Sequence, residues 1–208
     1  MTHYKLTYFD VRAKAEFIRQ LFTLAGVDFE DNRIPAGSDE WPELKKKMTY
    51  ERVPVLEFDG KQLAQANAIA KYIAAEHGFN GSNAWEAALI DSVGTHYEDL
   101  FNACRAFYLG WLKLNNLTLE DAYKNSVVPA RDAFYPPICK FLRESKSGFI
   151  IGDKPSWVDL LVADHSETFV RYNPDYLKDY PEAKAHLEKV HSLPAIKKWI
   201  EKRPNREI

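Results

Sequence analysis

The chain changes its hydrophobic pattern near residue 80, and this change limits the possible folds more than any other feature. Before it, short strand-like runs alternate with helical patterns. After Gly81-Ser82-Asn83, apolar residues recur every three or four positions over about seven helical turns, and no strand pattern returns. We therefore predict a mixed α/β domain over residues 1–79 and an all-helical C-terminal domain over residues 80–208.

The order of elements defines the architecture of the first domain. Asp59-Gly60, between two short apolar runs, is a strong β-hairpin signal. The expected elements are a strand at 4–8, a helix at 14–25, a strand at 27–34, a short helix from 41, strands at 55–58 and 61–64, and a helix at 66–77. This βαβα order followed by ββα predicts a thioredoxin-like domain, with helices on both faces of a mixed sheet.

The helical domain carries two capping boxes, in which a hydroxyl accepts a backbone amide three residues later. Thr118-Leu119-Glu120-Asp121 predicts the start of a long helix, and Ser156-Trp157-Val158-Asp159 predicts another. The first helix of this domain is expected to bury one long apolar series: Trp85, Leu89, Val93, Tyr97, Leu100, Cys104, Tyr108 and Trp111.

Charge and composition exclude several functions. The net charge is −2 and the short lysine runs fall in helical patterns, so we expect no nucleic-acid or anionic-membrane partner. No apolar window reaches about eighteen residues, and residues 1–5 lack a signal-peptide pattern, so we expect a cytoplasmic protein without a membrane span. Cys104 and Cys139 fit no disulfide framework and the six histidines fit no ligand spacing, so no metal is expected.

Tyr8 is the strongest candidate for chemistry. It ends the first predicted strand, and a basic helix start at Arg12 and Lys14 follows. In an α/β sheet, ligands collect where the carboxyl end of a strand meets a helix N-terminus. A phenol there can donate a hydrogen bond to an anion while staying neutral, because its ordinary pKa is about 10. Taken alone, Tyr8 also fits a tyrosine that merely closes a core strand.

Two further junctions suit a peptide-like ligand. Val53-Pro54 precedes the third strand, and a cis bond there would leave the Val53 backbone free to pair with an added strand. Gln65-Ala66-Asn67 begins a helix, whose free N–H groups can bind a carboxylate. An ordinary trans proline and an ordinary helix start remain the alternatives at these two places.

Several motifs in this chain occur together in one known family. They are Tyr4-Lys5-Leu6-Thr7-Tyr8-Phe9, Arg12-Ala13-Lys14-Ala15-Glu16, Trp41-Pro42 with Lys45, Val53-Pro54-Val55-Leu56, Leu63-Ala64-Gln65, and the capping box at Ser156. Jointly they make the chain resemble the cytosolic glutathione transferases over its whole length, and most closely the sigma class in its nematode branch. The resemblance implies the glutathione transferase fold, glutathione as co-substrate, a homodimer, and conjugation of the glutathione thiolate to hydrophobic electrophiles in detoxification.

The resemblance also implies a role for individual residues. Tyr8 donates its hydrogen bond to the glutathione sulfur, and Lys14 stands where the family commonly has arginine. The other implied contacts are Trp41 and Lys45 at the glycyl end, Arg52, Val53 and Pro54 along the cysteinyl unit, Gln65 and Ala66 at the γ-glutamyl carboxylate, and Asp99 of the partner subunit at the γ-glutamyl ammonium. The second substrate is expected between Phe9, Arg12, Tyr108 and Ile208.

A hydrogen bond of ordinary strength is enough for this chemistry. A free thiol has a pKa of about 8.5 and is mostly protonated at neutral pH. A donor aimed at the sulfur stabilises the thiolate and lowers that pKa. A charge-assisted hydrogen bond contributes about 1.5–3 kcal/mol, which corresponds to a pKa lower by about one to two units. The proton can leave to solvent, so no separate base is required.

The chain departs from the family pattern at several positions. Ala66 replaces a serine whose hydroxyl would touch the ligand carboxylate, and losing about 1 kcal/mol there weakens binding about fivefold. Ala13 and Glu51 stand where glycine is frequent. Two alternatives stay open: a non-catalytic carrier of hydrophobic ligands such as haem, and a glutathione-dependent prostaglandin isomerase. Thiol–disulfide exchange is excluded, because no cysteine precedes Cys104.

Overall fold

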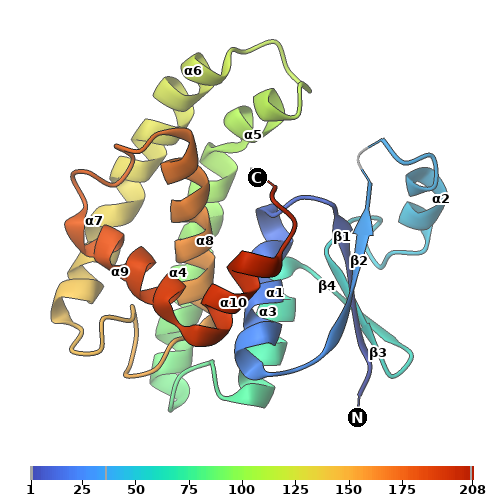
Figure 1. The fold of residues 1–208 in the computed structure, drawn as a ribbon, viewed down its shortest axis with the longest axis horizontal. Helices are drawn as coiled ribbons and strands as arrows, with labels where there is room; N and C mark the ends of the chain where they lie inside the picture. The colour runs from blue at the N-terminus through green and yellow to red at the C-terminus, as the bar shows by residue number, and fades with distance from the viewer. Residues whose placement is uncertain (1, 36, 207) are drawn as a thin grey trace.

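The N-terminal domain is built on a four-stranded sheet in a computed structural model that describes residues 2–35, 37–206 and 208 (Figure 1). The strand order is β2-β1-β3-β4, with β1 and β2 parallel and the other neighbours antiparallel. The elements are β1 (Tyr4–Phe9), α1 (Ala13–Ala25), β2 (Phe29–Ile34), α2 (Trp41–Lys46), β3 (Val55–Phe58), β4 (Lys61–Ala64) and α3 (Ala66–His77). This confirms the predicted thioredoxin-like arrangement.

Helices cover both faces of the sheet (Figure 1). On one face α1 and α3 pack against β1, and Leu6, Ile18 and Ile73 are fully buried there. On the other face α2 contributes Leu44 to a small second cluster, formed by Met48, Val55 and Ala64. The apolar positions therefore divide between two layers, as a sheet buried on both faces requires.

The C-terminal domain contains helices and no strand among the residues that the structure describes. Its elements are α4 (Ala84–Ala103), α5 (Arg105–Trp111), α6 (Leu119–Ala122), the π-helical turn η1 (Tyr123–Val127), α7 (Val128–Glu144), α8 (Trp157–Tyr172), α9 (Pro181–Ser192) and α10 (Pro194–Lys202). Helix α8 is its central element, buried along most of its length. None of the described helices combines the length and apolar character needed to cross a bilayer.

Three element boundaries differ from the sequence predictions. The second strand begins at Phe29, because the Val27 N–H still donates to the Phe22 carbonyl (3.0 Å) and so completes the end of α1. The long apolar series is broken at Cys104, which separates α4 from α5. The helix predicted from Thr118 is divided by η1, which ends two residues before Pro129, a residue with no N–H for the helical ladder.

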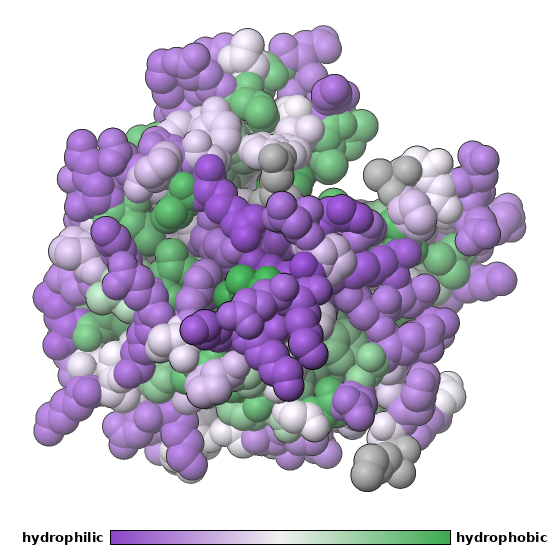
Figure 2. All heavy atoms as spheres, in the orientation of Figure 1, coloured by the Kyte–Doolittle hydropathy of each residue, from purple (hydrophilic) through white to green (hydrophobic). Residues whose placement is uncertain are grey.

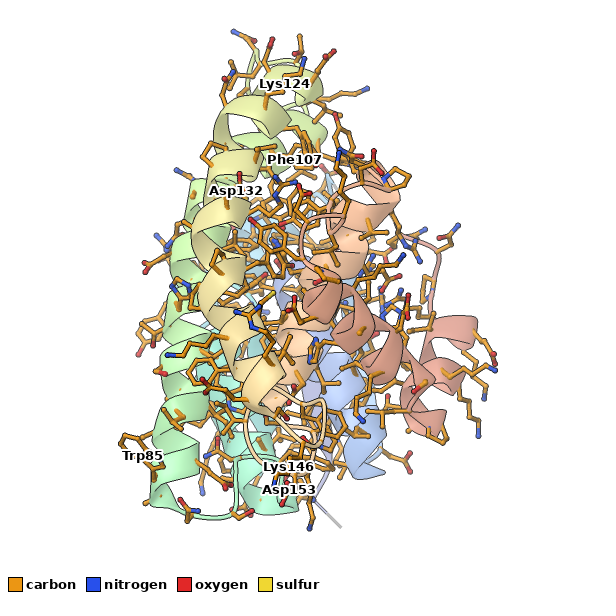
Figure 3. The ribbon with its side chains drawn as sticks, turned by 90° about the vertical axis from the view of Figure 1, so that its left-hand side faces the viewer. Trp85, Phe107, Lys124, Asp132, Lys146 and Asp153 are labelled. Carbon is orange, nitrogen blue, oxygen red and sulfur yellow. The ribbon has the colours of Figure 1, made fainter. Side chains whose placement is uncertain are left out.

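Trp85 also differs from its prediction as a core residue. It is 72% exposed and projects outward near the start of α4, whereas Phe107 points into the helical core (Figure 3). Much of the molecular face shown in Figure 2 is hydrophilic, with apolar residues in scattered patches. Because Trp85 is exposed, it does not take part in the core that Val93, Tyr97 and Leu100 of the same helix help to form.

Close packing and a buried capping residue hold the helical domain together, and buried ion pairs join it to the N-terminal domain. A Cβ on Gly94 of α4 would lie 2.2 Å from the Trp157 ring, so only glycine fits there. Asp159, which is fully buried, accepts the Ser156 N–H (2.7 Å) and the Ile150 N–H (2.8 Å), as a structural capping residue should. Arg12, which directly precedes α1, contacts Asp164 and Glu167 of α8.

Candidate active site

Tyr8 lies near the carboxyl end of β1, where the sequence placed it. The side chain is 8% exposed, and its hydroxyl receives a hydrogen bond from the backbone N–H of Lys14. Burial raises the pKa of Tyr8, although the Lys14 hydrogen bond and the charge of Arg19 oppose that rise. The phenol therefore stays protonated at neutral pH. Because its oxygen accepts from Lys14, its own proton remains available for another acceptor.

A cavity of about 200 Å³ is connected to Tyr8 through Lys14, although Tyr8 itself is not among the residues that line it. It is lined by Lys14, Tyr50, Arg52, Val53, Pro54, Ala64, Gln65 and Ala66. The structure thus brings together most of the residues predicted to bind a peptide-like ligand, from three separate segments of the chain. The Val53–Pro54 peptide bond is cis, as predicted.

Gln65 joins β4 to α3 in an unusual backbone conformation. Its φ is +77°, which residues other than glycine rarely adopt, and such conformations concentrate at functional sites. No side chain caps the start of α3, and Ala66 is nearly buried there. The first N–H groups of α3 therefore face the cavity region as donors for an anion.

Asn67 does not replace the hydroxyl that Ala66 lacks. Its Nδ2 atom donates to the Gly94 carbonyl of α4 (3.3 Å), and its buried Oδ1 has no partner in the described part of the chain. The side chain thus turns toward the helical domain. It fixes the start of α3 against α4.

The residues predicted to hold the glycyl end lie together on α2. The Trp41 ring packs edge-on against Phe9, with 5.0 Å between ring centroids. The Lys45 ammonium lies 3.8 Å from the Glu51 carboxylate, and both side chains are substantially exposed. Lys45 is therefore weakly paired, and an incoming carboxylate competes with Glu51 for it.

Lys14 connects the cavity to the helical domain. Its ammonium is 2.9 Å from Glu98 and lies over the Phe101 ring, 4.4 Å from the centroid. Both partners belong to α4. The ammonium is thus held at the boundary of the cavity by an ion pair and a cation–π contact.

The predicted site for the second substrate is only partly assembled. Tyr108 and Ile208 line a small cavity of about 10 Å³. Its other lining residues are Ala13, Tyr97, Phe101, Asp164, His165 and Thr168. Phe9 instead packs against Tyr8 and Trp41. Arg12 requires a correction: it is 1% exposed because Asp164 and Glu167 bind its guanidinium, so it does not border an apolar surface.

Two residues lie where sequence reasoning had not looked for them. Tyr50, 61% exposed, lines the cavity of about 200 Å³. In the sequence, only its aromatic side chain close to Val53-Pro54 could have indicated a place in the site. Tyr97 was assigned to the core series but reaches the smaller cavity. Asp99 is exposed on α4 and is not among the residues lining either cavity of its own chain.

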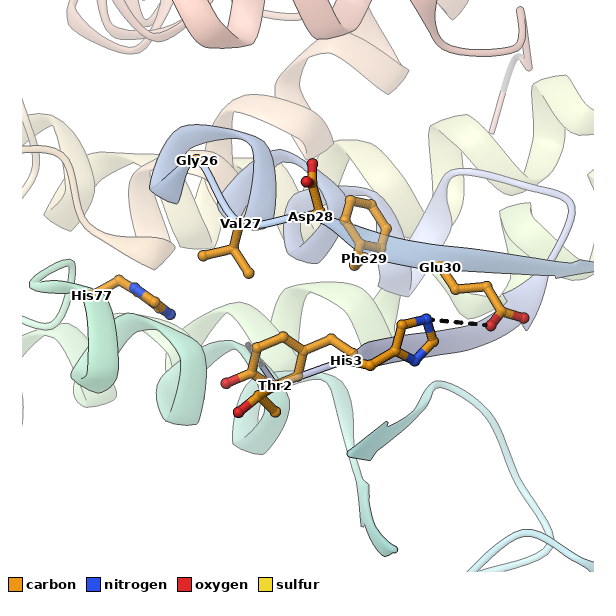
Figure 4. Close-up of a pocket in the computed structure, with 9 residues that line it drawn as sticks. Thr2, His3, Gly26, Val27, Asp28, Phe29, Glu30 and His77 are labelled. Atoms are coloured by element: carbon orange, nitrogen blue, oxygen red, sulfur yellow. Dashed lines mark ion pairs between the residues drawn. The ribbon is translucent and has the colours of Figure 1, made fainter. Parts of the chain in front are cut away.

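A hollow of about 750 Å³ lies at the opposite end of the sheet (Figure 4). It is an open groove at the amino ends of β1 and β2, bordered by His3, Asp28, Glu30 and His77. Ligands in α/β sheets bind at carboxyl ends, so the smaller cavity near Tyr8 is the better candidate. In the ranges that the structure describes, no cluster of His, Cys, Asp or Glu is arranged to bind a metal.

Comparison with known proteins identifies the family of the chain. A model of the glutathione S-transferase N-terminal domain matches residues 4–75, and a C-terminal domain model of the same family matches residues 110–203. Probable glutathione S-transferase 7 of Caenorhabditis elegans is 42% identical, with 98% of each chain covered. Monomeric Na-GST-3 of the hookworm Necator americanus is 45% identical with a TM-score of 0.94, covering 99% of this chain and 100% of that chain. A Nu-class protein from Haemonchus contortus is 43% identical with a TM-score of 0.89, and both chains are fully covered.

Fold, site and relatives together define a two-domain enzyme that uses glutathione as co-substrate. The chain belongs to the glutathione S-transferase family and is a glutathione transferase. The finer expectation of a sigma-class protein stays a prediction, because the Haemonchus relative is described as Nu class.

Proposed function

We propose that the cavity beside β1 binds glutathione and that Tyr8 holds the glutathione sulfur as a thiolate for attack on hydrophobic electrophiles. The observation that supports this most strongly is a buried, neutral phenol whose oxygen accepts from the N–H of Lys14, a residue that lines the cavity together with Arg52, Gln65 and the start of α3. A neutral donor stabilises the thiolate without supplying a second ionising group. Conjugation of this kind serves the removal of reactive apolar compounds.

The remaining roles follow from the charges of the tripeptide. The start of α3, with Gln65 and Ala66, receives the γ-glutamyl carboxylate, because helix N-termini favour anions. Lys45 and Trp41 hold the glycyl end, and Lys45 supplies the counter-charge. The Val53 backbone pairs with the cysteinyl unit, while Lys14, Arg52 and Pro54 bound the cavity.

We also propose a cytoplasmic homodimer in the nematode branch of the family. Asp99 is exposed on α4, away from the cavity in its own chain, which suits a contribution across an interface. In that assembly Asp99 of the partner subunit faces the γ-glutamyl ammonium. Light scattering tests the assembly directly. The relatives reported above carry the names of glutathione transferases, which does not favour the haem-carrier or prostaglandin-isomerase alternatives.

Replacing Tyr8 by phenylalanine tests the proposed mechanism. We expect Tyr8→Phe to lower kcat with 1-chloro-2,4-dinitrobenzene at least about tenfold, since it removes a bond of about 1.5–3 kcal/mol to the thiolate. Glutathione affinity measured by calorimetry at about pH 6 should change less than about twofold, because the ligand then binds mainly as the thiol and the bond to the thiolate contributes little. Tyr4→Phe, in the same strand but at its other end, is the matched control.

The pH profile gives a second, independent readout. The thiolate is needed for attack, so kcat/KM should rise with pH and level off above the pKa of the bound thiol. The midpoint of that rise should move up by about one to two pH units in Tyr8→Phe. Because burial raises the pKa of Tyr8, the wild-type plateau should extend to about pH 9 without a fall. Equal rates and equal profiles for the two proteins would remove Tyr8 from the mechanism.

A further inference from the structure

The loop that follows β1 returns to the proposed catalytic residue. It consists of residues 10–12 and leads into α1, whose second residue, Lys14, donates its backbone N–H to the Tyr8 hydroxyl. The phenol oxygen is therefore held by the first turn of α1. A shift of the loop moves Lys14 relative to Tyr8 and so changes the direction in which the phenol proton points.

Ala13 lies between this loop and Lys14 in an unfavourable backbone conformation. Its φ is +33°, a region that residues other than glycine rarely adopt. Such a conformation costs energy and persists where the surrounding contacts fix the chain on both sides. Because Lys14 is the next residue, its hydrogen bond to Tyr8 depends on the contacts that hold the loop.

Asp10 supplies charged contacts at the start of the loop. Its Oδ1 atom accepts from Arg33 Nη1 of β2 (3.2 Å), and its Oδ2 atom accepts from Nε (3.2 Å) and Nη2 of Arg206. Arg33 is in turn held by Asp31 (2.7 Å). The hydrogen bond from Arg206 is the main cause that lowers the pKa of Asp10, so the carboxylate is ionised at neutral pH. One carboxylate thus joins the loop both to the sheet and to the C-terminal segment.

The backbone of the loop is held by the same two parts of the chain. The Asp10 N–H donates to the Ile34 carbonyl of β2 (2.8 Å), and the Arg12 N–H donates to the Ile208 carbonyl (2.7 Å). Arg12 is buried, whereas the Asp10 side chain is 25% exposed. Asp10 can therefore be replaced with little change to the core, and its replacement tests the loop contacts on their own.

We propose that Asp10 is a positioning residue for Tyr8. Its ion pairs with Arg33 and Arg206 keep the loop in place, and so keep the Lys14 N–H on the phenol oxygen with the phenol proton directed at the glutathione sulfur. The inference rests on the proposed function of Tyr8. Asp10 is not among the residues that line the cavity of about 200 Å³, so it acts through the loop and not on the ligand.

The charge of Asp10 and its positioning role have opposite effects on the bound thiol. A carboxylate disfavours a nearby thiolate, so removal of its charge alone would lower the pKa of the glutathione thiol. Loss of the loop position weakens the hydrogen bond from Tyr8 to the sulfur, and this raises the same pKa. The sign of the change in thiol pKa therefore distinguishes the two effects.

The test measures the pKa of glutathione bound to the protein, by ultraviolet difference titration of the thiolate. We expect Asp10→Ala to raise this pKa by about 0.5–1 pH unit, about half of the shift expected for Tyr8→Phe. Turnover of 1-chloro-2,4-dinitrobenzene at about pH 6.5 should fall about threefold to tenfold, while glutathione affinity at about pH 6 changes less than about twofold. Arg206→Ala should give a smaller rise, and no further rise when added to Asp10→Ala. Arg143→Ala, which removes an exposed ion pair with Glu182 in the helical domain, is the matched control and should leave the thiol pKa unchanged.

The outcomes separate this inference from the proposed function. If Tyr8→Phe raises the thiol pKa but Asp10→Ala lowers it or leaves it unchanged, Asp10 has no positioning role and the proposed function stands. A rise caused by Asp10→Ala that persists in the Tyr8→Phe background would also overturn the inference, because the effect has to pass through the phenol. If Asp10→Ala does not fold, Arg206→Ala, whose side chain is 45% exposed, is subjected to the same comparison with Tyr8→Phe. An unchanged thiol pKa in Tyr8→Phe itself would refute both proposals together.

Discussion

Glu51 holds a backbone conformation that glycine adopts more easily, and this makes a sharp test of the site. Its φ is +51°, in the left-handed region, where a Cβ costs about 1–2 kcal/mol. Glycine removes that cost but gives the unfolded chain additional freedom, worth about 0.5–1 kcal/mol. The exposed Lys45–Glu51 pair adds little, since such pairs contribute about 0–1 kcal/mol. We expect Glu51→Gly to stabilise the protein by about 0.5–1 kcal/mol, which raises Tm by about 1–4 °C.

Glu51→Gln separates the backbone effect from the charge effect. It keeps a side chain at positive φ, so it should give no gain in Tm. Both variants free Lys45 for the glycyl carboxylate, so both should tighten glutathione binding about twofold, or about 0.4 kcal/mol. Thermal unfolding and calorimetric titration measure the two effects. Equal Tm values for Glu51→Gly and Glu51→Gln would refute the strain argument, and unchanged affinity in both would show that Glu51 does not compete for Lys45.

Two further predictions concern the start of α3 and the helical core. Ala66→Ser should tighten glutathione binding about fivefold by calorimetry, because it restores a hydroxyl at an uncapped helix start, and an unchanged Kd would contradict this account. Asp159→Ala should lower the free energy of unfolding in urea by at least about 3 kcal/mol, because the Ser156 N–H, the Ile150 N–H and His186 lose their buried acceptor. Asp153→Ala, on the nearby exposed loop, is the control.

Local patterns were sufficient to predict the elements that form the candidate site. The Asp59-Gly60 turn predicted the hairpin of β3 and β4, and the strand expected at 4–8 is β1. Gln65 and Val53 were found in the same way, because each lies at a junction between elements. Where a residue's surroundings come from its neighbours in sequence, the sequence is informative.

Residues whose environment depends on distant segments were predicted less well. Arg12 was expected at an open surface, but its partner Asp164 lies 152 residues further along the chain. Tyr97 has the spacing of a core residue, and only the position of α8 reveals the cavity beside it. The break at Cys104 leaves the apolar period intact, so no local pattern marks it. Such features follow from tertiary packing rather than from propensity.

Several residues that distinguish the N-terminal domain lie where this domain packs against helix α4. Ala13, at φ +33°, precedes Lys14, whose N–H binds Tyr8 and whose ammonium is held by Glu98 of α4. At the other side of the glutathione cavity, Asn67 anchors the start of α3 to the Gly94 carbonyl of the same helix. Helix α4 therefore positions both Lys14, which donates to the Tyr8 hydroxyl, and the start of α3. In the proposed mechanism the thioredoxin-like domain supplies the contacts to glutathione, and their relative placement depends on the helical domain packed against it.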